Sequence, residues 1–165
     1  MKPSAINLLL ASCFILTVAC TSIDCPLNNV VLAKYTFYDS NGDSVKLADT
    51  LSVITTHIDG PQQDSVLFNR LTQRAKFTLP VSYNGREDEF IFHFWNSYDD
   101  VTDTVRIQKT SKPHFESVDC APVYFHTVNE VWSTHNIIDS VVINHKTIDY
   151  DSSKENFKIY LHTGY

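Results

Sequence analysis

The sequence has few glycines, no internal repeat and no block of basic residues. Only four of its 165 residues are glycine, whereas 43% are apolar and 12% are aromatic. This composition excludes low-complexity disorder and indicates a packed domain. Thirteen basic residues are outnumbered by 19 acidic ones, for a formal net charge of −6. An acidic chain without a basic cluster is not expected to bind nucleic acid or to attract an anionic membrane surface.

Motifs that carry catalysis or bind metal are also missing. The sequence has no His-Glu-x-x-His or His-x-x-x-His pattern and no Gly-x-Ser-x-Gly elbow. Among seven histidines, His126 and His135 with Asp139 form the most plausible metal-binding trio. Histidines that are hydrogen-bonded or face solvent are the simpler interpretation. We therefore expect no metal, no cofactor and no enzyme.

Clusters of acidic residues fall beside predicted turns, where such side chains hydrogen-bond their own backbone. We expect solvated turns at two clusters: Asp99, Asp100 and Asp103, and Asp149 with Asp151. A third cluster, Asp39, Asn41 and Asp43, resembles the start of a calcium loop. Its glycine comes one residue early and its twelfth position is Thr50, which favours a turn.

The first 19 residues have the layout of an export signal. Lys2 supplies a positive charge, and residues 8–19 form an apolar run that is too short for the ~20 residues of a transmembrane helix. Ala19 followed by Cys20 indicates a bacterial lipobox, although Thr17 stands where leucine is more common. Plain secretion is the alternative. We expect a signal peptide over 1–19, a lipidated tether over 20–29 and one domain over 30–165.

Two cysteines remain for a disulfide. Cys13 leaves with the leader and Cys20 would carry lipid, so Cys25 and Cys120 are the candidates. Disulfides persist in the oxidising compartments that exported chains enter. Two free buried thiols are the alternative.

Alternation of apolar and polar residues predicts about nine short strands and no helix. The clearest cases are residues 33–38, 51–58, 75–83, 90–95, 101–108, 139–144 and 157–161. Asn41-Gly42 predicts a hairpin between residues 33–38 and a strand from Val45, and Asn84-Gly85 predicts one joining residues 75–83 to 90–95. Ser111-Lys112-Pro113 is expected to break the chain. Such a pattern is typical of an all-β sandwich of two antiparallel sheets, immunoglobulin-like or prealbumin-like.

Several short motifs resemble those of an uncharacterised family of small lipoproteins from Bacteroides-type bacteria. They are the lipobox, Cys25-Pro26-Leu27-Asn28-Asn29, residues 35–38, Phe77-Thr78-Leu79-Pro80, Asp119-Cys120 running into residues 123–128, and Ile138-Asp139-Ser140-Val141. The resemblance implies export, lipid attachment at Cys20 and an outer-membrane or periplasmic address. Surface display usually follows an acidic run after the lipidated cysteine. One acid, Asp24, follows here, which favours the periplasmic face of the outer membrane.

Four aromatic side chains are candidates for binding. Trp95, Tyr98, Tyr124 and Trp132 are expected at strand ends, in loops or on an outer sheet face, where aromatic rings bind sugars or protein partners. The alternative is that they cap the core. Two classes of function follow: a non-enzymatic envelope module that binds a protein or glycan, or a small envelope hydrolase built from scattered His and Asp residues.

Lipid attachment can be tested by removing the acceptor sulfur. Cys20→Ser is expected to leave the processed protein soluble in the periplasm, since the acyl chains on this cysteine would be its stable anchor. Cell fractionation measures this. A variant that still sediments with membranes would contradict the lipobox interpretation.

Overall fold

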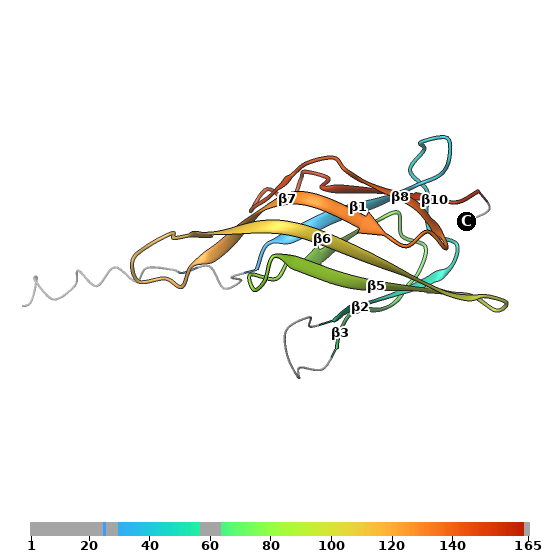
Figure 1. Cartoon of the computed structure of the whole chain (residues 1–165), viewed down its shortest axis with the longest axis horizontal. Coiled ribbons are helices and arrows are strands. Elements are labelled where there is room, and N and C mark those ends of the chain that lie inside the picture. Colours follow the sequence, from blue (N-terminus) through green and yellow to red (C-terminus); the bar gives the residue numbers. More distant parts are fainter. Residues whose placement is uncertain (1–24, 26–29, 57–63, 164–165) are drawn as a thin grey trace, which may run out of the picture.

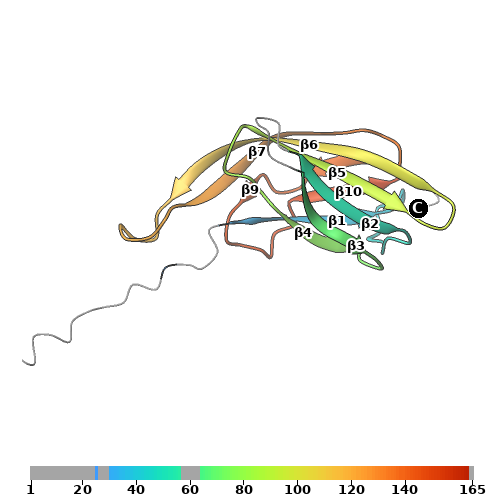
Figure 2. The ribbon, with the colours of Figure 1, turned by 90° about the horizontal axis from the view of Figure 1, so that it is seen from below.

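The computed structural model describes residue 25, residues 30–56 and residues 64–163, and Cys20 lies outside these ranges. Within them the chain forms ten strands in two sheets, which confirms the predicted all-β sandwich (Figures 1 and 2). The described residues contain no helix that could cross a membrane. The strands are β1 (Leu32–Tyr38), β2 (Thr50–Thr56), β3 (Ser65–Leu71), β4 (Lys76–Pro80), β5 (Glu87–Trp95), β6 (Asp100–His114), β7 (Val123–Ser133), β8 (Ile138–Ile143), β9 (Thr147–Ile148) and β10 (Phe157–Leu161).

The two sheets differ in size and in strand direction. The smaller sheet has the order β4-β1-β10-β8, and the larger has the order β3-β2-β5-β6-β7-β9. All pairs in the larger sheet are antiparallel. In the smaller sheet β1 and β10 run parallel, with Tyr35 opposite Phe157 and Phe37 opposite Ile159. The expectation of two purely antiparallel sheets is therefore corrected at this one pair.

The core lies between the inner faces of the two sheets. Strand alternation places Phe90, Phe92 and Phe94 of β5 inside, each at most 2% exposed. Aromatic rings of the smaller sheet meet them across the interface: Phe77 of β4 contacts Phe92 edge-on with ring centroids 6.1 Å apart. Such buried aromatic pairs contribute more than their buried area alone.

The first predicted hairpin is confirmed only around its turn, and the second is wrong in its pairing. The Asn41-Gly42 turn exists, and the Asp39 carboxylate accepts the N–H of residues 41 and 43. The returning chain makes a single bridge, Tyr38 with Ser44. The chain through Asn84 and Gly85 carries β4 into a different sheet from β5, since β4 pairs with β1 whereas β5 pairs with β2 and β6. A two-residue turn signal does not encode which sheet the next strand joins.

Strand β6 continues through the predicted break at residues 111–113 and pairs with β7 as far as His114 opposite Val123. Pro113 is tolerated because β5 pairs with β6 only as far as Gln108, which leaves that edge of β6 without a sheet partner. The β6–β7 hairpin therefore extends past the rest of its sheet. We call residues 115–122, which join the two strands, the tip loop.

A disulfide joins Cys25 to Cys120 in the tip loop, as the sequence predicts, with their Cα atoms 5.5 Å apart. It links positions 95 residues apart. A crosslink over so long a loop removes much of the conformational freedom of the unfolded chain. It also fastens the start of the domain to the end of the β6–β7 hairpin.

A buried carboxylate connects the two sheets. Asp103 lies on the inner face of β6 and is 0% exposed, so the expected solvated turn is wrong at this residue. Its oxygens accept the Thr134 hydroxyl at 2.6 Å and the backbone N–H groups of residues 136, 137 and 138 at 2.7 to 2.9 Å. All four donors belong to the segment that leads from β7 in the larger sheet to β8 in the smaller one.

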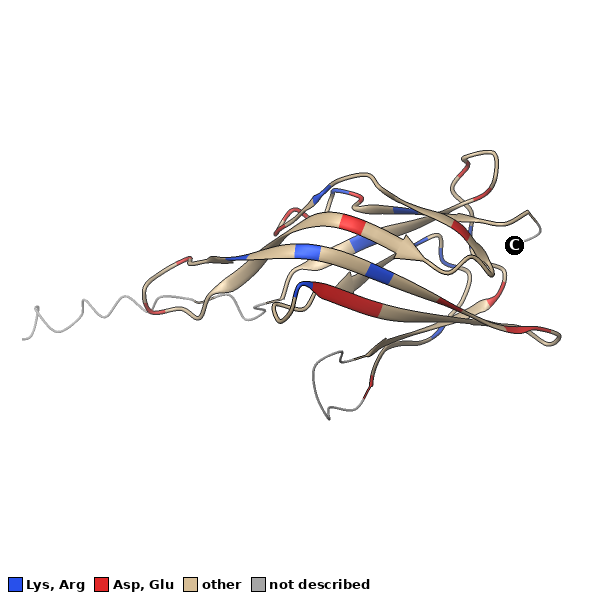
Figure 3. Ribbon diagram, in the orientation of Figure 1, with Lys and Arg blue, Asp and Glu red and all other residues tan. Residues whose placement is uncertain are grey.

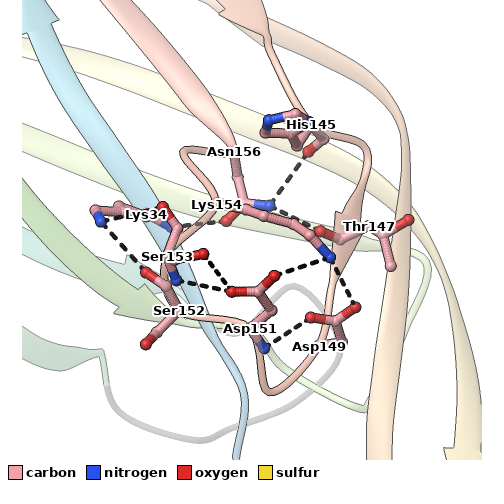
Figure 4. Close-up of polar contacts among 9 residues, drawn as sticks. All are labelled: Lys34, His145, Thr147, Asp149, Asp151, Ser152, Ser153, Lys154 and Asn156. Atoms are coloured by element: carbon pink, nitrogen blue, oxygen red, sulfur yellow. Dashed lines mark hydrogen bonds and ion pairs between the residues drawn. The ribbon is translucent and has the colours of Figure 1, made fainter.

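A buried amide closes the smaller sheet beside the parallel pair (Figure 4). Asn156 accepts the N–H of Lys34 at 2.9 Å and donates to the carbonyls of His145 and Thr147 at 3.2 and 2.9 Å. Its own backbone N–H donates to the Lys34 carbonyl. One side chain thus satisfies backbone groups from the β1 strand and from the chain between β8 and β10.

Removing the crosslink is expected to destabilise the domain. Cys25→Ser and Cys120→Ser should each lower the free energy of unfolding by about 2 to 4 kcal/mol, and the double variant should be no worse than either. Denaturant unfolding measures the change. Two reactive thiols per unreduced, unfolded chain would show that the bridge does not form.

Asp103→Asn should be more damaging than its conservative chemistry suggests. An asparagine amide would direct N–H donors at backbone N–H groups, so we expect a loss of about 3 kcal/mol or more. Asp100→Asn, on the same strand but with a 74% exposed side chain, is the control and should cost less than about 1 kcal/mol. Equal losses for the two variants would contradict the role given to Asp103.

Candidate functional site

The outer face of the larger sheet carries the most functional side chains of the described residues. Inward phenylalanines of β5 alternate with outward Ile91, His93 and Trp95, which are half-buried. Trp95 is paired with Asp100 and Trp132 with Arg106, both on the outward-facing set of β6 residues. The two tryptophans therefore lie on one side of the sheet. We call this surface, on β5, β6 and β7, the outer face.

Trp132 belongs to a polar array that crosses four strands, β7, β6, β5 and β2. The Arg106 guanidinium lies over the Trp132 ring, 5.6 Å from its centroid, and Arg106 Nε donates to Glu89 Oε2 at 2.6 Å. Glu89 also accepts the Thr56 hydroxyl at 2.8 Å. Desolvation raises the pKa of Glu89, but these two contacts outweigh it and the net pKa is lowered. Trp132 itself remains 53% exposed. Its ring is therefore accessible to a partner while the Arg106 guanidinium helps to hold it in place.

Trp95 has a second arginine over its ring. The Arg70 guanidinium lies 5.0 Å from the Trp95 centroid. Arg70 sits in β3 where the register with β2 shifts between Leu51 and Val53, and its φ of 65° is in the left-handed region. Such bulges redirect a side chain, and non-glycine residues rarely adopt this backbone. The irregular strand is what brings Arg70 to Trp95.

Charges on the outer face alternate in register. Glu89 on β5 stands opposite Arg106 on β6, and the His93 Nε2 atom contacts the carboxylate of Asp100. Figure 3 shows acidic and basic segments side by side across β5, β6 and β7. Paired charges of this kind leave the face without a strong net sign. Recognition there would therefore depend on aromatic surface and hydrogen bonds more than on long-range attraction.

The other two candidate aromatics lie elsewhere. Tyr98 is 94% exposed in the loop between β5 and β6, and Tyr124 stacks on Tyr83 with ring centroids 5.3 Å apart. Two strand spacings and six residues along β6 separate Trp95 from Trp132, which places them roughly 20 Å apart. The structure therefore joins two of the four candidates on one face and separates Tyr98 and Tyr124 from it.

A buried ionic pair underlies the opposite side of the same sheet. The Lys109 ammonium lies 2.9 Å from Asp88 Oδ1, with both side chains at most 6% exposed. Burial raises the pKa of Asp88 even beside this cation. Next to the pair, Ser111 Oγ lies 2.9 Å from His126 Nδ1. Burial, together with the Lys109 charge, lowers the pKa of His126 to about 4. A histidine only 2% exposed and so weakly basic is poorly suited to activate a serine.

Two segments with possible metal ligands, the Asp149–Asp151 turn and the segment with His135 and Asp139, do not form a metal site. Lys154 Nζ lies 3.6 Å from Asp149 and 3.3 Å from Asp151, where a cation would otherwise bind (Figure 4). Asp149 also accepts the backbone N–H of residue 151, as expected for a turn. His135 contacts the backbone oxygen of Asp139. No group of three metal-ligating side chains occurs within the described residues.

An open depression of about 280 Å³ beside β8 and β10 holds a serine, a histidine and an aspartate. The Ser140 hydroxyl donates to Asp139 Oδ2 at 3.1 Å, and His162 Nδ1 lies 3.7 Å from the other Asp139 oxygen. Both side chains thus approach the acid. Ser140 is paired with Asp139 and not with the histidine, so the arrangement lacks the nucleophile–base contact that hydrolysis requires.

Sequence reasoning identified the two tryptophans but missed Arg70 and Arg106. Arg106 follows Val105 and precedes Ile107 in a clean alternation, so its outward direction was readable. Its partner across the sheet was not, because strand neighbours depend on topology. Arg70 had no readable signal, since its place depends on a bulge.

The acid sensitivity of the fold should depend on His126. An unfolded histidine titrates near 6.5, so below that pH the unfolded state binds more protons and stability falls until about pH 4. We expect a loss of up to about 3 kcal/mol across this window, which His126→Asn should largely abolish. Unfolding measured between these pH values tests it, with His145→Asn at an exposed site as the control. Identical pH slopes for wild type and His126→Asn would contradict the assignment.

Comparison with known proteins assigns the chain to a family but gives it no activity. A family model matches residues 50–161, from the start of β2 to the end of β10, and describes a family of unknown function. No curated protein and no solved structure matches the chain. Since the matched segment covers more than half of the sequence, the protein belongs to the family of unknown function DUF6452.

Proposed function

We propose that this protein is a lipid-anchored, non-enzymatic module of the bacterial cell envelope that binds a protein or glycan partner through the outer face. The observation that carries the proposal is the pair of arginine-capped tryptophans, Trp95 under Arg70 and Trp132 under Arg106, on one side of the larger sheet. The family match supplies no activity with which this conflicts.

Physical reasons favour binding at this face. Tryptophan and arginine are the residues most often dominant in interfaces, and a tryptophan ring also stacks on sugar rings. The Arg106 side chain is held by Glu89, so it loses little conformational freedom when a partner binds. The platform is therefore partly organised before binding.

Location is supported by the residues that precede the domain. The leader and the Ala19-Cys20 pair favour export and lipid attachment, and a disulfide between Cys25 and Cys120 suits an oxidising compartment. We place the domain on the periplasmic face of the outer membrane, held by acyl chains on Cys20.

A small envelope hydrolase is the second candidate, because Ser111 and His126 are within hydrogen-bond distance. The pair lies on the inner side of the sheet beside the Lys109 cation, and among the described residues no carboxylate hydrogen-bonds to the histidine ring. Ser111→Ala abolishing a hydrolytic activity would support this candidate over the binding module.

Fluorescence gives a direct test, because the chain has only two tryptophans and both lie on the outer face. Titration with peptidoglycan fragments or outer-membrane polysaccharide should change tryptophan emission if a glycan covers the face. For a protein partner, a photocrosslinking residue at Thr102, exposed between the two tryptophans, should capture one species in living cells.

The matched variants decide the outcome. Trp95→Ala with Trp132→Ala leaves no tryptophan to report, so its binding is measured by calorimetry. Binding or capture should weaken about 30-fold or more, equivalent to at least ~2 kcal/mol for a dominant contact. Tyr83→Ala, which removes an exposed aromatic ring elsewhere, should leave both unchanged. Capture that survives loss of both tryptophans would reject the outer face as the binding site.

A further inference from the structure

We propose that the tip loop rests on the phospholipid bilayer and places Phe115 and Val118 in its interfacial region. This inference rests on the proposed lipid anchor at Cys20 and adds a second membrane contact to it. The protein would then stand on the membrane at a fixed end of the domain instead of hanging from a free tether.

The tip loop exposes more apolar surface than a connecting loop needs. Val118 is 97% exposed and Phe115 is 61% exposed, within four residues of each other. They sit at the end of the hairpin, which runs past β5 to one end of the long axis of the molecule (Figures 1 and 2). Exposed apolar residues gathered at an extremity mark a contact with a partner or a membrane.

The disulfide brings this loop to the anchor. Cys25 is bonded to Cys120 with Cα atoms 5.5 Å apart, and Cys120 is two residues from Val118. Cys25 lies five positions after Cys20, a span of at most about 18 Å when fully extended. The Cα atom of Cys120 is therefore held within about 24 Å of the acylated residue, and that of Val118, two residues away, within about 31 Å, whatever path the tether takes. No partner other than the bilayer is guaranteed to be this close.

The base of the tip loop is braced, so its apolar side chains are kept outward. The ring of His114 stacks on Phe125 with centroids 4.4 Å apart, and Tyr150 meets Phe125 edge-on at 5.0 Å. Cys120 is 7% exposed and ties the far side of the loop. Phe115 and Val118 lie beyond this braced base.

Charges around the loop define the kind of membrane it fits. Lys112 is one exposed cation, whereas Glu116 and Asp119 are two acids, and Glu116 lies 3.3 Å from His114 Nε2. A tip loop with a slightly negative net charge is not attracted electrostatically to anionic lipids. Contact would depend on apolar burial and would be insensitive to salt, which suits a zwitterionic phospholipid surface.

The opposite end of the domain supplies an internal control. The loop that contains Tyr98 lies at the other end of the long axis (Figure 1), and Tyr98 is 94% exposed. An aromatic probe at position 98 is as exposed as one at the tip but is directed away from the bilayer. The two positions therefore separate contact with lipid from simple exposure.

The experiment uses the full mature, acylated chain with Trp95→Phe and Trp132→Phe, so that a single new tryptophan reports. Phe115→Trp or Val118→Trp is reconstituted into vesicles of phosphatidylethanolamine and phosphatidylcholine. We expect emission to shift to shorter wavelength, and brominated acyl chains to quench most of it, with no change in high salt. Tyr98→Trp should emit as in water and resist quenching.

The outcomes separate the tip contact from the anchor. Mass spectrometry of Cys20 and flotation with vesicles test the anchor alone. If the chain is acylated and floats but tryptophans at 115 and 118 both emit as in water, the tip contact is wrong and the anchor stands. If Cys20 carries no lipid and the chain does not float, the anchor fails and the tip proposal fails with it. Circular dichroism like that of the parent chain shows that each variant is folded.

Discussion

The burial of one carboxylate fixes the connection between β7 of the larger sheet and β8 of the smaller one. Asp103 is buried inside the sandwich, where four donors from the segment between β7 and β8 stabilise it. A buried carboxylate that loses its hydrogen-bond donors strongly destabilises the fold. The segment that supplies these donors therefore has little freedom to shift. Because β8 pairs with β10, and β10 with β1, this crossing helps to position the smaller sheet, together with the other connections between the sheets.

Sequence patterns succeeded where local physics decides the outcome. Alternation in residues 90–95 and 157–161 identified the inward residues of β5 and β10, because strand periodicity is a property of the chain itself. The two remaining cysteines identified the disulfide by elimination.

Sequence patterns failed where the structure depends on residues that are distant in the sequence. The Asn84-Gly85 pair predicts a hairpin, although the turn connects two sheets. The sequence also predicts a solvated turn at Asp103, because the donors that surround it are more than 30 residues away. The guanidinium of Arg70 reaches Trp95 through a bulge that no short window of sequence reveals.

The larger sheet serves two purposes on its two sides. Its inner face buries the phenylalanines of β5 together with the Lys109–Asp88 pair, and its outer face carries tryptophans, arginines and their acidic partners. Strand alternation lets neighbouring residues of one strand contribute to both. A substitution on β6 therefore acts on the core or on the outer face according to whether its position is odd or even, and residues 105 and 106 show the contrast directly. The long β6–β7 hairpin adds a third region, beyond the core, whose only covalent tie to the rest of the described chain besides the backbone is the disulfide.

The parallel pairing of β1 with β10 has a consequence for how the chain reaches this structure. The first strand of the domain lies between β4 and the last strand, with Tyr35 opposite Phe157. Contacts of such sequence separation form late, since closing the intervening loop is unfavourable until many other contacts exist. A chain made in order from its N-terminus presents β1 long before β10 is available. One edge of β1 is meanwhile an open strand edge, the kind of surface that pairs with other chains.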